Sequence, residues 1–563
     1  MRNYQPFILL GSLLVSAASI HAKPAKPGLR EYIQPDGTKI EIKVVGDEYL
    51  HFTTTPDDIL LFLDEDGYYK PGTFNNDGSI VALNVTTYNG IDNSKLVNIK
   101  DIDRDDILSR RKTTKRRLAP QSGIGLTKTA CPSTGSPRAL IILVEYSDVK
   151  FNQSYNAVDY FNDMINGDNF TQFGGTGSAL KYFRDQSGGK FTPQFDVLGP
   201  VTLPHNQAYY GKNDRFGDDI NPQLMVTDAI DILDAKVNFS VYDTNKDGVI
   251  DNVYIFYAGQ GEADFGDENS IWPHSWDVRS AGVNKVVDGV IVGHYACSNE
   301  WSETTPDGMG SFVHEYSHVL GLPDLYHTES SNADYTPGSY SVMDYGNYNN
   351  DSRTPCNYTA YERNALGWFE PIVLGEPQSL ILPDISSGKF CLIPTTKDTE
   401  FFLLENRQQT GWDKYIANHG MLIWHIDYNA SDFDNNTVNN SRLHQRVDIV
   451  EANNSPGINF EVGYTFPGTT GKTAFTSETS PALKSWSGKK INVPITNIAE
   501  KDGRIYFDVC GGGTQYEAGI NYAFDDKDYV PEYYNLQGVR ILNPAKGMML
   551  IEKRGDRISK IIY

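Results

Sequence analysis

The chain has 563 residues, of which 39% are hydrophobic and 12% aromatic, and its formal net charge is −23 at pH 7. This length is enough for about three or four globular domains. The strong negative charge argues against nucleic acid or an anionic membrane surface as a partner. Five cysteines, an odd number in so long a chain, argue against a disulfide scaffold.

Residues 1–22 have the pattern of a secretory signal peptide. Arg2 gives a short positive start, an apolar run extends from Phe7 to Ala18, and Ala22 is a small residue suited to cleavage. The apolar run is too short to span a membrane, and no later segment reaches about 18 uninterrupted apolar residues. We therefore expect an exported protein without a transmembrane segment.

Residues 23–130 predict a separate, mostly β segment. Glycines separate short apolar runs such as Lys39–Val45 and Ile59–Leu63. The segment ends near Arg110–Arg117, the one dense basic run of an acidic chain. Such a run is by default a solvated linker. Its place between this segment and the α/β region that follows also fits a processing site for trypsin-like cleavage.

From Pro137 onward the pattern is that of an α/β domain. A continuous apolar run predicts a strand that is buried on both faces, and helical periodicity follows it. We expect strands at Ala139–Val144, Val253–Tyr257 and Val290–Tyr295, helices at Ser178–Arg184 and Gln223–Leu233, and a loop at Ala258–Gly266. Val290–Tyr295 is the candidate for a sheet-edge strand that pairs with an extended peptide.

An acidic loop resembles the first part of an EF-hand calcium site. Its oxygen side chains occupy positions 1, 3, 5 and 9, which are Asp243, Asn245, Asp247 and Asp251. Position 12 is Tyr254, so the bidentate glutamate is missing and a complete EF-hand is excluded. The loop predicts a Ca²⁺ site completed by carboxylates from elsewhere; an acidic turn held by Asx hydrogen bonds is the alternative.

The run HExxHxxGxxD, residues 314–324, predicts a catalytic zinc site. On a helix, His314 and His318 project from one face and can bind one metal ion, with Glu315 beside them to act on a water molecule. Gly321 can leave the helix in a left-handed turn. Asp324 then follows as the third ligand, which leaves the fourth tetrahedral position open.

A second motif, Ser341–Gly346, agrees with the first. Met343 resembles the Met-turn methionine of metzincin-type zinc proteases, and Tyr345 matches the place where some of them put a hydroxyl near the metal. Most metzincins carry a third histidine where this chain has Asp324. His327 and Glu329 are the alternatives to Asp324 as third ligand.

If the α/β domain is a zinc protease, the preceding segment is a propeptide that keeps it latent. Latency needs a group that displaces the catalytic water, and Asp47 and Cys131 are the candidates, with ordinary loop residues as the alternative. Among the other cysteines, Cys297–Cys356 and Cys391–Cys510 are the pairs to test as disulfides. Buried unpaired thiols are equally compatible with the sequence.

After about residue 370 the chain becomes rich in β-pattern. Apolar runs at this spacing suggest a β-sandwich. The runs are Phe401–Leu404, Met421–Ile426, Val447–Val450 and Arg504–Val509. The end of the chain predicts a further short β unit, with a hairpin formed by Gly547–Glu552 and Arg557–Tyr563.

In this order, the motifs resemble the immune inhibitor A-like metallopeptidases, secreted zinc proteases of bacteria, over roughly residues 30–512. Beside the zinc motif, the acidic loop and Ser341–Gly346, the segments that carry the resemblance are Gln34–Thr38, Gly46–Tyr49, Ile271–His274, Leu403–Arg407, Gly420–Asp427 and Phe466–Gly468. The tail, including Tyr533–Arg540, departs from that family. It looks like a sorting or surface-attachment module found on exported proteins of Bacteroides-type bacteria.

The resemblance implies a multidomain protein with a metzincin-like α/β zincin catalytic domain. We divide the chain into a signal peptide (1–22), a propeptide (23–130), the catalytic domain (131–370), a β-sandwich domain (371–512) and a C-terminal β module (513–563). The expected activity is hydrolysis of extracellular proteins or peptides, with His314, His318 and Asp324 as zinc ligands and Glu315 as general base. The alternative is an inactive relative that binds protein or glycan as an adhesin.

Overall fold

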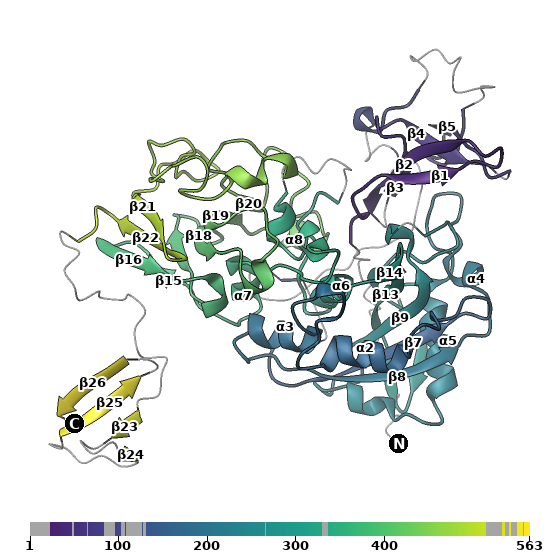
Figure 1. Ribbon diagram of the computed structural model, residues 1–563, viewed down its shortest axis with the longest axis horizontal. Helices are drawn as coiled ribbons and strands as arrows, with labels where there is room; N and C mark the ends of the chain where they lie inside the picture. The colour runs from purple at the N-terminus through teal and green to yellow at the C-terminus, as the bar shows by residue number, and fades with distance from the viewer. Residues whose placement is uncertain are drawn as a thin grey trace, which may run out of the picture.

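The computed structural model describes most of the chain (Figure 1). The described residues are 23–47, 50–64, 66–83, 96–102, 107, 126–127, 131–264, 266–328, 336–513, 532–534, 540–541, 549–554 and 557–562. The predicted signal peptide, the basic run Arg110–Arg117 and Glu329 lie outside them. Among the described helices, none combines the length and apolarity that crossing a membrane requires.

The N-terminal segment forms a six-stranded antiparallel meander in which each strand pairs with the next. Its strands are β1 (Arg30–Ile33), β2 (Lys39–Asp47), β3 (Leu50–Thr54), β4 (Leu60–Leu63), β5 (Tyr69–Phe74) and β6 (Ile80–Ala82), followed by the 3₁₀ turn η3 (Ile99–Asp101). Leu50, Phe52 and Leu60 form its small core with Ile99 and Ile107. The mostly β pattern expected for this segment is therefore present.

A mixed sheet in the order β10-β13-β9-β7-β8 forms the centre of the next region. Its strands are β7 (Arg138–Glu145), β8 (Gln194–Thr202), β9 (Val253–Gln260), β10 (His274–Asp277) and β13 (His294–Ser302), with β14 (Thr305–Pro306) paired to β13. The four strands from β13 to β8 run parallel, whereas β10 and β14 are antiparallel to β13.

Helices cover both faces of this sheet (Figure 1). They are α2 (Ala157–Asn166), α3 (Ala179–Gln186), α4 (Gln207–Gly211), α5 (Pro222–Leu233) and α6 (Gly310–Val319), whereas α7 (Ala360–Ala365) packs against β18 (Glu400–Arg407) of the region that follows. Successive side chains of a strand point to opposite faces. Accordingly, Ile141 and Leu143 share a core with α2, α3 and α6, and Leu140 and Ile142 share another with α5. Burial on both faces explains the continuous apolar run of β7.

The structure contradicts the expected sheet-edge strand. Gly293 divides the predicted segment into β12 (Val290–Val292), which pairs with β11 (Lys285–Val287), and β13. Because β13 pairs with β9 on one side and with β10 and β14 on the other, it is an interior strand. The strand at this edge of the sheet is β10. Its sequence, His-Ser-Trp-Asp, is polar and therefore contains no apolar run that would predict a strand. The expected loop also starts later, since β9 continues to Gln260.

The following region contains two sheets, in the orders β15-β17-β18-β19-β20 and β16-β22-β21. The strands are β15 (Ile372–Val373), β16 (Gln378–Leu382), β17 (Cys391–Pro394), β18 (Glu400–Arg407), β19 (Gly420–Asp427), β20 (Val447–Ile449), β21 (Ile495–Lys501) and β22 (Arg504–Val509), with helix α8 (Ala430–Asp434) before β20. Both sheets contribute side chains to one core.

The other face of the first sheet packs into the core of the preceding α/β region. In β18, Phe402 and Leu404 belong to the core between the two sheets, while Leu403 belongs to the core that contains α6. In β19, Ile423 belongs to the core between the two sheets and Trp424 belongs to the core that contains α6. The α/β region and the β region are thus joined through a continuous apolar interior.

Short 3₁₀ turns connect many of these elements. They are η4 (Gln172–Gly174), η5 (Phe239–Tyr242), η6 (Glu262–Asp264), η7 (Gly338–Tyr340), η8 (Tyr345–Tyr348), η9 (Ile385–Ser387), η10 (Gly411–Asp413) and η11 (Ile458–Gly463). At the end of the chain a small sheet has the order β24-β23-β25-β26. It comprises β23 (Glu532–Tyr534), β24 (Arg540–Ile541), β25 (Met549–Arg554) and β26 (Arg557–Ile562), and the last two form the predicted antiparallel hairpin.

All five cysteines are free thiols, so both proposed disulfide pairings are wrong. Cys297 lies on β13 in the core with α5, whereas Cys356 lies in the core that contains α6. Cys391 is buried on β17 and Cys510 is only partly buried at the end of β22. The thiols act as small apolar side chains, which is a common role of unpaired cysteine.

Candidate metal centre

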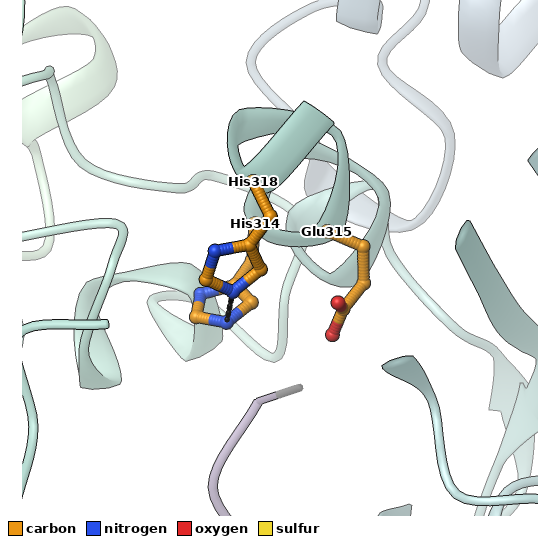
Figure 2. Close-up of side chains that lie close together, drawn as sticks. All are labelled: His314, Glu315 and His318. Carbon is orange, nitrogen blue, oxygen red and sulfur yellow. Dashed lines mark hydrogen bonds between the residues drawn. The ribbon is translucent and has the colours of Figure 1, made fainter. Parts of the chain in front are cut away.

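Helix α6 presents its two histidines on one face and packs the other against the sheet. Phe312 and Tyr316, four residues apart, lie in the core with Tyr254 and Phe256 of β9. His314 and His318, with the same spacing, project together from the adjacent face (Figure 2). After α6, Gly321 has a φ of +100°, a left-handed conformation that favours glycine. The predicted turn after the helix is therefore present.

Each imidazole is held by a backbone carbonyl through its Nδ1 atom. His314 Nδ1 lies 2.8 Å from the Val342 carbonyl oxygen, and His318 Nδ1 lies 2.8 Å from that of Leu322. A carbonyl oxygen only accepts hydrogen bonds, so both Nδ1 atoms carry the proton. Both Nε2 atoms then present lone pairs toward one point, and they lie 3.2 Å apart. Such outer hydrogen bonds are typical of metal-binding histidines.

Asp324 completes a triangle with the two imidazoles. Its Oδ1 atom lies 3.2 Å from His314 Nε2 and 3.2 Å from His318 Nε2. Tetrahedral zinc with ligand bonds of about 2.0–2.1 Å would separate its ligand atoms by roughly 3.3–3.4 Å. The Asp324 carboxylate is fully buried, and its Oδ1 atom has no hydrogen-bond partner within the described structure. The three residues therefore fit a zinc ion.

A residue distant in sequence holds the Asp324 carboxylate in place. Asn436 Nδ2 donates to Asp324 Oδ2 at 2.6 Å, and the Asp324 amide donates to Asn436 Oδ1 at 2.8 Å. Burial disfavours the charge of Asp324, but the adjacent His318 and His314 hold its pKa well below the ordinary value. Of the three candidates for third ligand, Asp324 is the one with described contacts to both imidazoles, and Glu329 lies outside the described residues.

Glu315 lies beside the cluster rather than within the triangle. Its carboxylate lies within 4.8 Å of the nitrogens of His314 and His318 (Figure 2), and Asp324 Oδ1 lies 3.2 Å from Nε2 of both. Asp324 is thus the candidate third ligand, because its Oδ1 atom lies 3.2 Å from both imidazole nitrogens. Burial is the main cause that raises the pKa of Glu315 to about 8, and its Oε2 atom lacks a partner among the described residues.

The turn at Ser341–Gly346 supports both ends of the ligand segment. Val342 holds His314 as described, and the Met343 carbonyl accepts the Leu325 amide at 2.9 Å. Met343 is fully buried. Tyr345 lies in η8 with its ring 6.5 Å from that of Tyr348, and burial, with Asp344 and Asp47, raises its pKa. Among the described contacts, none joins the Tyr345 hydroxyl to the three ligand residues.

The start of the described chain lies in this site, which sequence reasoning missed. The Lys23 backbone amide donates to Glu315 Oε1 at 3.0 Å. Trp272 Nε1 donates to the Lys23 carbonyl at 3.1 Å, and the Tyr348 hydroxyl donates to the Pro24 carbonyl at 2.7 Å. Lys23 has no exposed surface. No motif marks these contacts, because they join residues separated by about 250–320 positions in the chain.

The two latency candidates have different surroundings. Asp47 is 1% exposed at the end of β2, where it is near enough to Tyr345 to affect the pKa of that residue. The neighbouring Gly46 carbonyl accepts the Ala25 amide at 2.8 Å, so this end of the hairpin lies beside the buried N-terminal segment. Cys131 packs against Tyr316 in the hydrophobic core, and burial raises its pKa to about 12. A thiol in that environment is a poor metal ligand.

The acidic loop is folded around its own backbone amides. Asp243 accepts the amides of Asp247 and Gly248 at 3.0 Å each, and Asp247 accepts that of Val249 at 2.9 Å. Asp251 is 2% exposed, and its Oδ1 atom has no partner among the described residues. Burial raises the pKa of Asp251 to about 6. Side-chain hydrogen bonds to backbone amides therefore account for most of the loop's conformation. The Asp251 Oδ1 atom is the acceptor that remains available to a cation.

Two histidines and an aspartate around one point, with a glutamate beside them, form a site of the metallopeptidase class. Comparison with known proteins agrees. Residues 132–369 match the model of the immune inhibitor A peptidase M6 catalytic domain. The resemblance inferred from the sequence is thereby confirmed for this part of the chain.

Two curated relatives are similar at modest identity. The chain is 29% identical over 206 residues to the pre-pro-metalloprotease PrtV of Vibrio cholerae serotype O1, covering 32% of this chain and 22% of PrtV. It is 28% identical over 251 residues to immune inhibitor A of Bacillus thuringiensis subsp. alesti, covering 38% of this chain and 36% of that protein. The chain thus spans well under half the length of either relative.

Proposed function

We propose that the protein is a secreted zinc-dependent endopeptidase that hydrolyses peptide bonds of extracellular proteins. His314, His318 and Asp324 are the metal ligands in this proposal. The observation that carries it is the triangle of ligand atoms with 3.2 Å sides, buried beside Glu315. The similarity to metallopeptidases over residues 132–369 supports the same reaction class.

The residues around the triangle have separable roles in hydrolysis. A zinc ion bound there supplies a Lewis acid that polarises the substrate carbonyl and acidifies a water molecule. Glu315 accepts the proton of that water and afterwards delivers it to the leaving amine nitrogen. Tyr345 is the candidate donor to the oxyanion of the tetrahedral intermediate. Val342 and Leu322 keep the imidazoles aligned throughout.

Replacing the general base tests this function. Glu315→Ala should retain zinc, because the three ligands remain, and should lose casein hydrolysis by about 100-fold or more. Zinc content and chelator-sensitive digestion of casein measure the two effects. Glu303→Gln, a charge change outside the ligand cluster, is the control. Full activity of Glu315→Ala would contradict the proposal, and a wild-type protein that binds zinc without hydrolysing any protein would favour the adhesin alternative.

The same proposal includes a proenzyme. Residues 23–130 act as an inhibitory propeptide, with the segment from Lys23 to Ala25 buried beside Glu315 and Asp47 close to Tyr345. Cleavage near Arg110–Arg117 releases it, and the acidic loop holds one Ca²⁺ ion through Asp243, Asn245, Asp247 and Asp251. N-terminal sequencing and metal analysis of the secreted protein test these points together. An unprocessed active protein without calcium would exclude both.

A further inference from the structure

Lys23 marks the position of a substrate residue. In the proposed reaction Glu315 gives a proton to the leaving amine, so the nitrogen beside its carboxylate belongs to the residue that follows the cleaved bond. The Lys23 backbone nitrogen occupies that place, 3.0 Å from Glu315 Oε1. Its side chain therefore fills the pocket that receives the side chain of this substrate residue.

The pocket around the Lys23 side chain is acidic and closed. Its ammonium nitrogen lies 2.6 Å from Asp264 Oδ2, 2.6 Å from Ser311 Oγ and 3.9 Å from Asp307 Oδ2. The Ser311 hydroxyl donates to Asp307 Oδ2 at 2.8 Å, which ties the second carboxylate to the first turn of α6. The Tyr348 ring lies 5.3 Å from the ammonium nitrogen. Lys23 and Asp264 have no exposed surface, and Asp307 is 5% exposed.

Charge decides which side chain this pocket prefers. A carboxylate buried without a partner is costly, and the pocket holds two of them. One lysine ammonium satisfies Asp264 and Ser311 directly, whereas leucine would leave the Asp264 carboxylate without this cation. Asp264 Oδ1 remains without a partner among the described residues. A polar pocket of this kind rejects a side chain that lacks the matching group far more strongly than an apolar pocket rejects a wrong size.

The backbone of the segment is held without regard to side-chain identity. The Lys23 and Pro24 carbonyls accept from Trp272 and Tyr348, and the Lys26 amide donates to the Ala263 carbonyl at 3.0 Å. Such contacts would hold any extended peptide. Two side chains of the segment make specific contacts: Lys26 Nζ donates to Ser302 Oγ at 3.0 Å from a half-buried position, and Lys23 is the one that is fully buried beside Glu315.

We infer that the enzyme cleaves peptide bonds on the amino side of lysine, and that Asp264 and Asp307 are its specificity-determining residues. This inference rests on the proposed peptidase function, since the position of Lys23 is interpreted through the role of Glu315. It gives the protein a substrate class, namely exposed lysine-containing segments of other proteins.

Fluorogenic peptides of one sequence test this specificity on the processed, secreted protein. They differ only in the residue after the scissile bond, which is lysine, arginine, leucine or glutamate, and product masses identify the bond. We expect kcat/KM for the lysine peptide to exceed that of the leucine peptide by about 100-fold or more. Equal cleavage of the lysine and leucine peptides at that bond would overturn the inference while leaving the peptidase function intact.

Variants locate the selectivity in the pocket. Asp264→Asn should reduce the preference for lysine to about 10-fold or less, and Asp307→Asn should reduce it by a smaller factor because that carboxylate lies farther from the ammonium. Glu268→Gln, an exposed change nearby, should keep the wild-type preference. Zinc content and the circular dichroism spectrum check that the variants fold. An unchanged preference in a folded Asp264→Asn protein would overturn the assignment.

If no peptide is cleaved, a binding measurement tests the lysine pocket independently of the peptidase function. Calorimetry would compare the peptides Lys-Pro-Ala-Lys and Leu-Pro-Ala-Lys, both amidated, on the same protein. If the dissociation constant of Lys-Pro-Ala-Lys is at least about 10-fold lower, the assignment of a lysine-binding pocket stands even though the peptidase function has failed. Equal binding would overturn the pocket as well.

Discussion

At the scale of single residues, the third ligand depends on a partner outside the zinc motif. Asn436, 112 residues later in the chain, holds Asp324 at two points: its Nδ2 atom donates to the carboxylate, and its Oδ1 atom accepts the Asp324 amide. Partners of this kind commonly change metal affinity by about 10–100-fold when they are removed. Asn436 also has a φ of +55°, which asparagine tolerates better than most residues.

We predict that Asn436→Gly lowers the affinity for zinc by about 10–100-fold. Glycine is chosen because it accepts the positive φ without strain, so the loss reports the missing side chain. Competition with a chromophoric chelator measures the affinity. Asn435→Ala changes the half-buried neighbour, which makes no described contact with Asp324, and should bind zinc as wild type does. If Asn436→Gly binds zinc as tightly as wild type, Asn436 does not position the ligand.

The zinc motif could be predicted from the sequence because helix geometry alone brings its residues together. His314, Glu315 and His318 need only one helix, and Gly321 needs only a local turn. Asn436, Lys23 and Asp264 could not be found in the same way. Their contacts join elements that are far apart in the chain, and their residue types are common on any protein surface.

At the scale of elements, helix α7 is linked to the turn that holds His314. Thr359 and Glu362 form a capping box, in which Glu362 Oε2 accepts the Thr359 amide at 2.6 Å. Its Oε1 atom accepts the Ser341 hydroxyl at 2.6 Å, one residue before Val342. Glu362 is fully buried, and burial raises its pKa to about 7. Its protonation state therefore affects the stability of the protein.

The sign of this effect follows from the raised pKa. The protonated form of Glu362 is favoured in the folded state, so its contribution is complete below the ordinary pKa of 4.5 and is lost as pH rises through about 7. We predict that Glu362→Gln, which keeps one acceptor and gains a donor, becomes more stable relative to wild type over that interval. The difference should grow by up to the order of 3 kcal/mol.

Urea unfolding at about pH 5 and about pH 8 measures this difference. Glu370→Gln, an exposed change just beyond α7, should give no such trend. A stability difference between Glu362→Gln and wild type that stays constant with pH would show that Glu362 is charged in the folded protein throughout.

Among the elements, long apolar runs were predicted well and polar strands were missed. Strands β7, β9 and β19 are buried on both faces, so each produced a continuous apolar signal. Strand β10 is short and polar, and pairing with β13 rather than its own sequence makes it a strand. The edge of the sheet was therefore assigned to the wrong segment.

At the scale of the whole molecule, residue 370 divides the α/β sequence pattern from the β-rich pattern. It does not divide the hydrophobic core, which contains side chains from both regions. Leu403, Leu422 and Trp424 pack with α6 and its neighbours, while the alternate residues pack against the second β sheet. Arg407 adds a buried link, because its guanidinium donates to the Tyr340 carbonyl at 3.0 Å and to the Asn357 carbonyl at 3.2 Å. The candidate metal centre depends on this interface, because Asn436 of the β region holds Asp324.

We predict that the α/β region and the β region unfold together. A chain that ends after residue 370 would expose the apolar face on which β18 and β19 lie, and it should fail to unfold cooperatively. A chain that ends at residue 513 keeps both and should give a single calorimetric transition for residues 131–513. Two separate transitions in the longer chain, or a stable shorter one, would contradict a shared core.

By itself, the sequence determined that His314, Glu315 and His318 share one helix, and it determined the order of β-rich and α/β segments. These depend on local spacing, residue type and period, which a linear pattern records. Only the tertiary structure decided that Asp324 closes the ligand triangle, that the cysteines are unpaired and that Lys23 fills an acidic pocket. Each of these depends on distances between residues far apart in the chain, which are set when the elements pack.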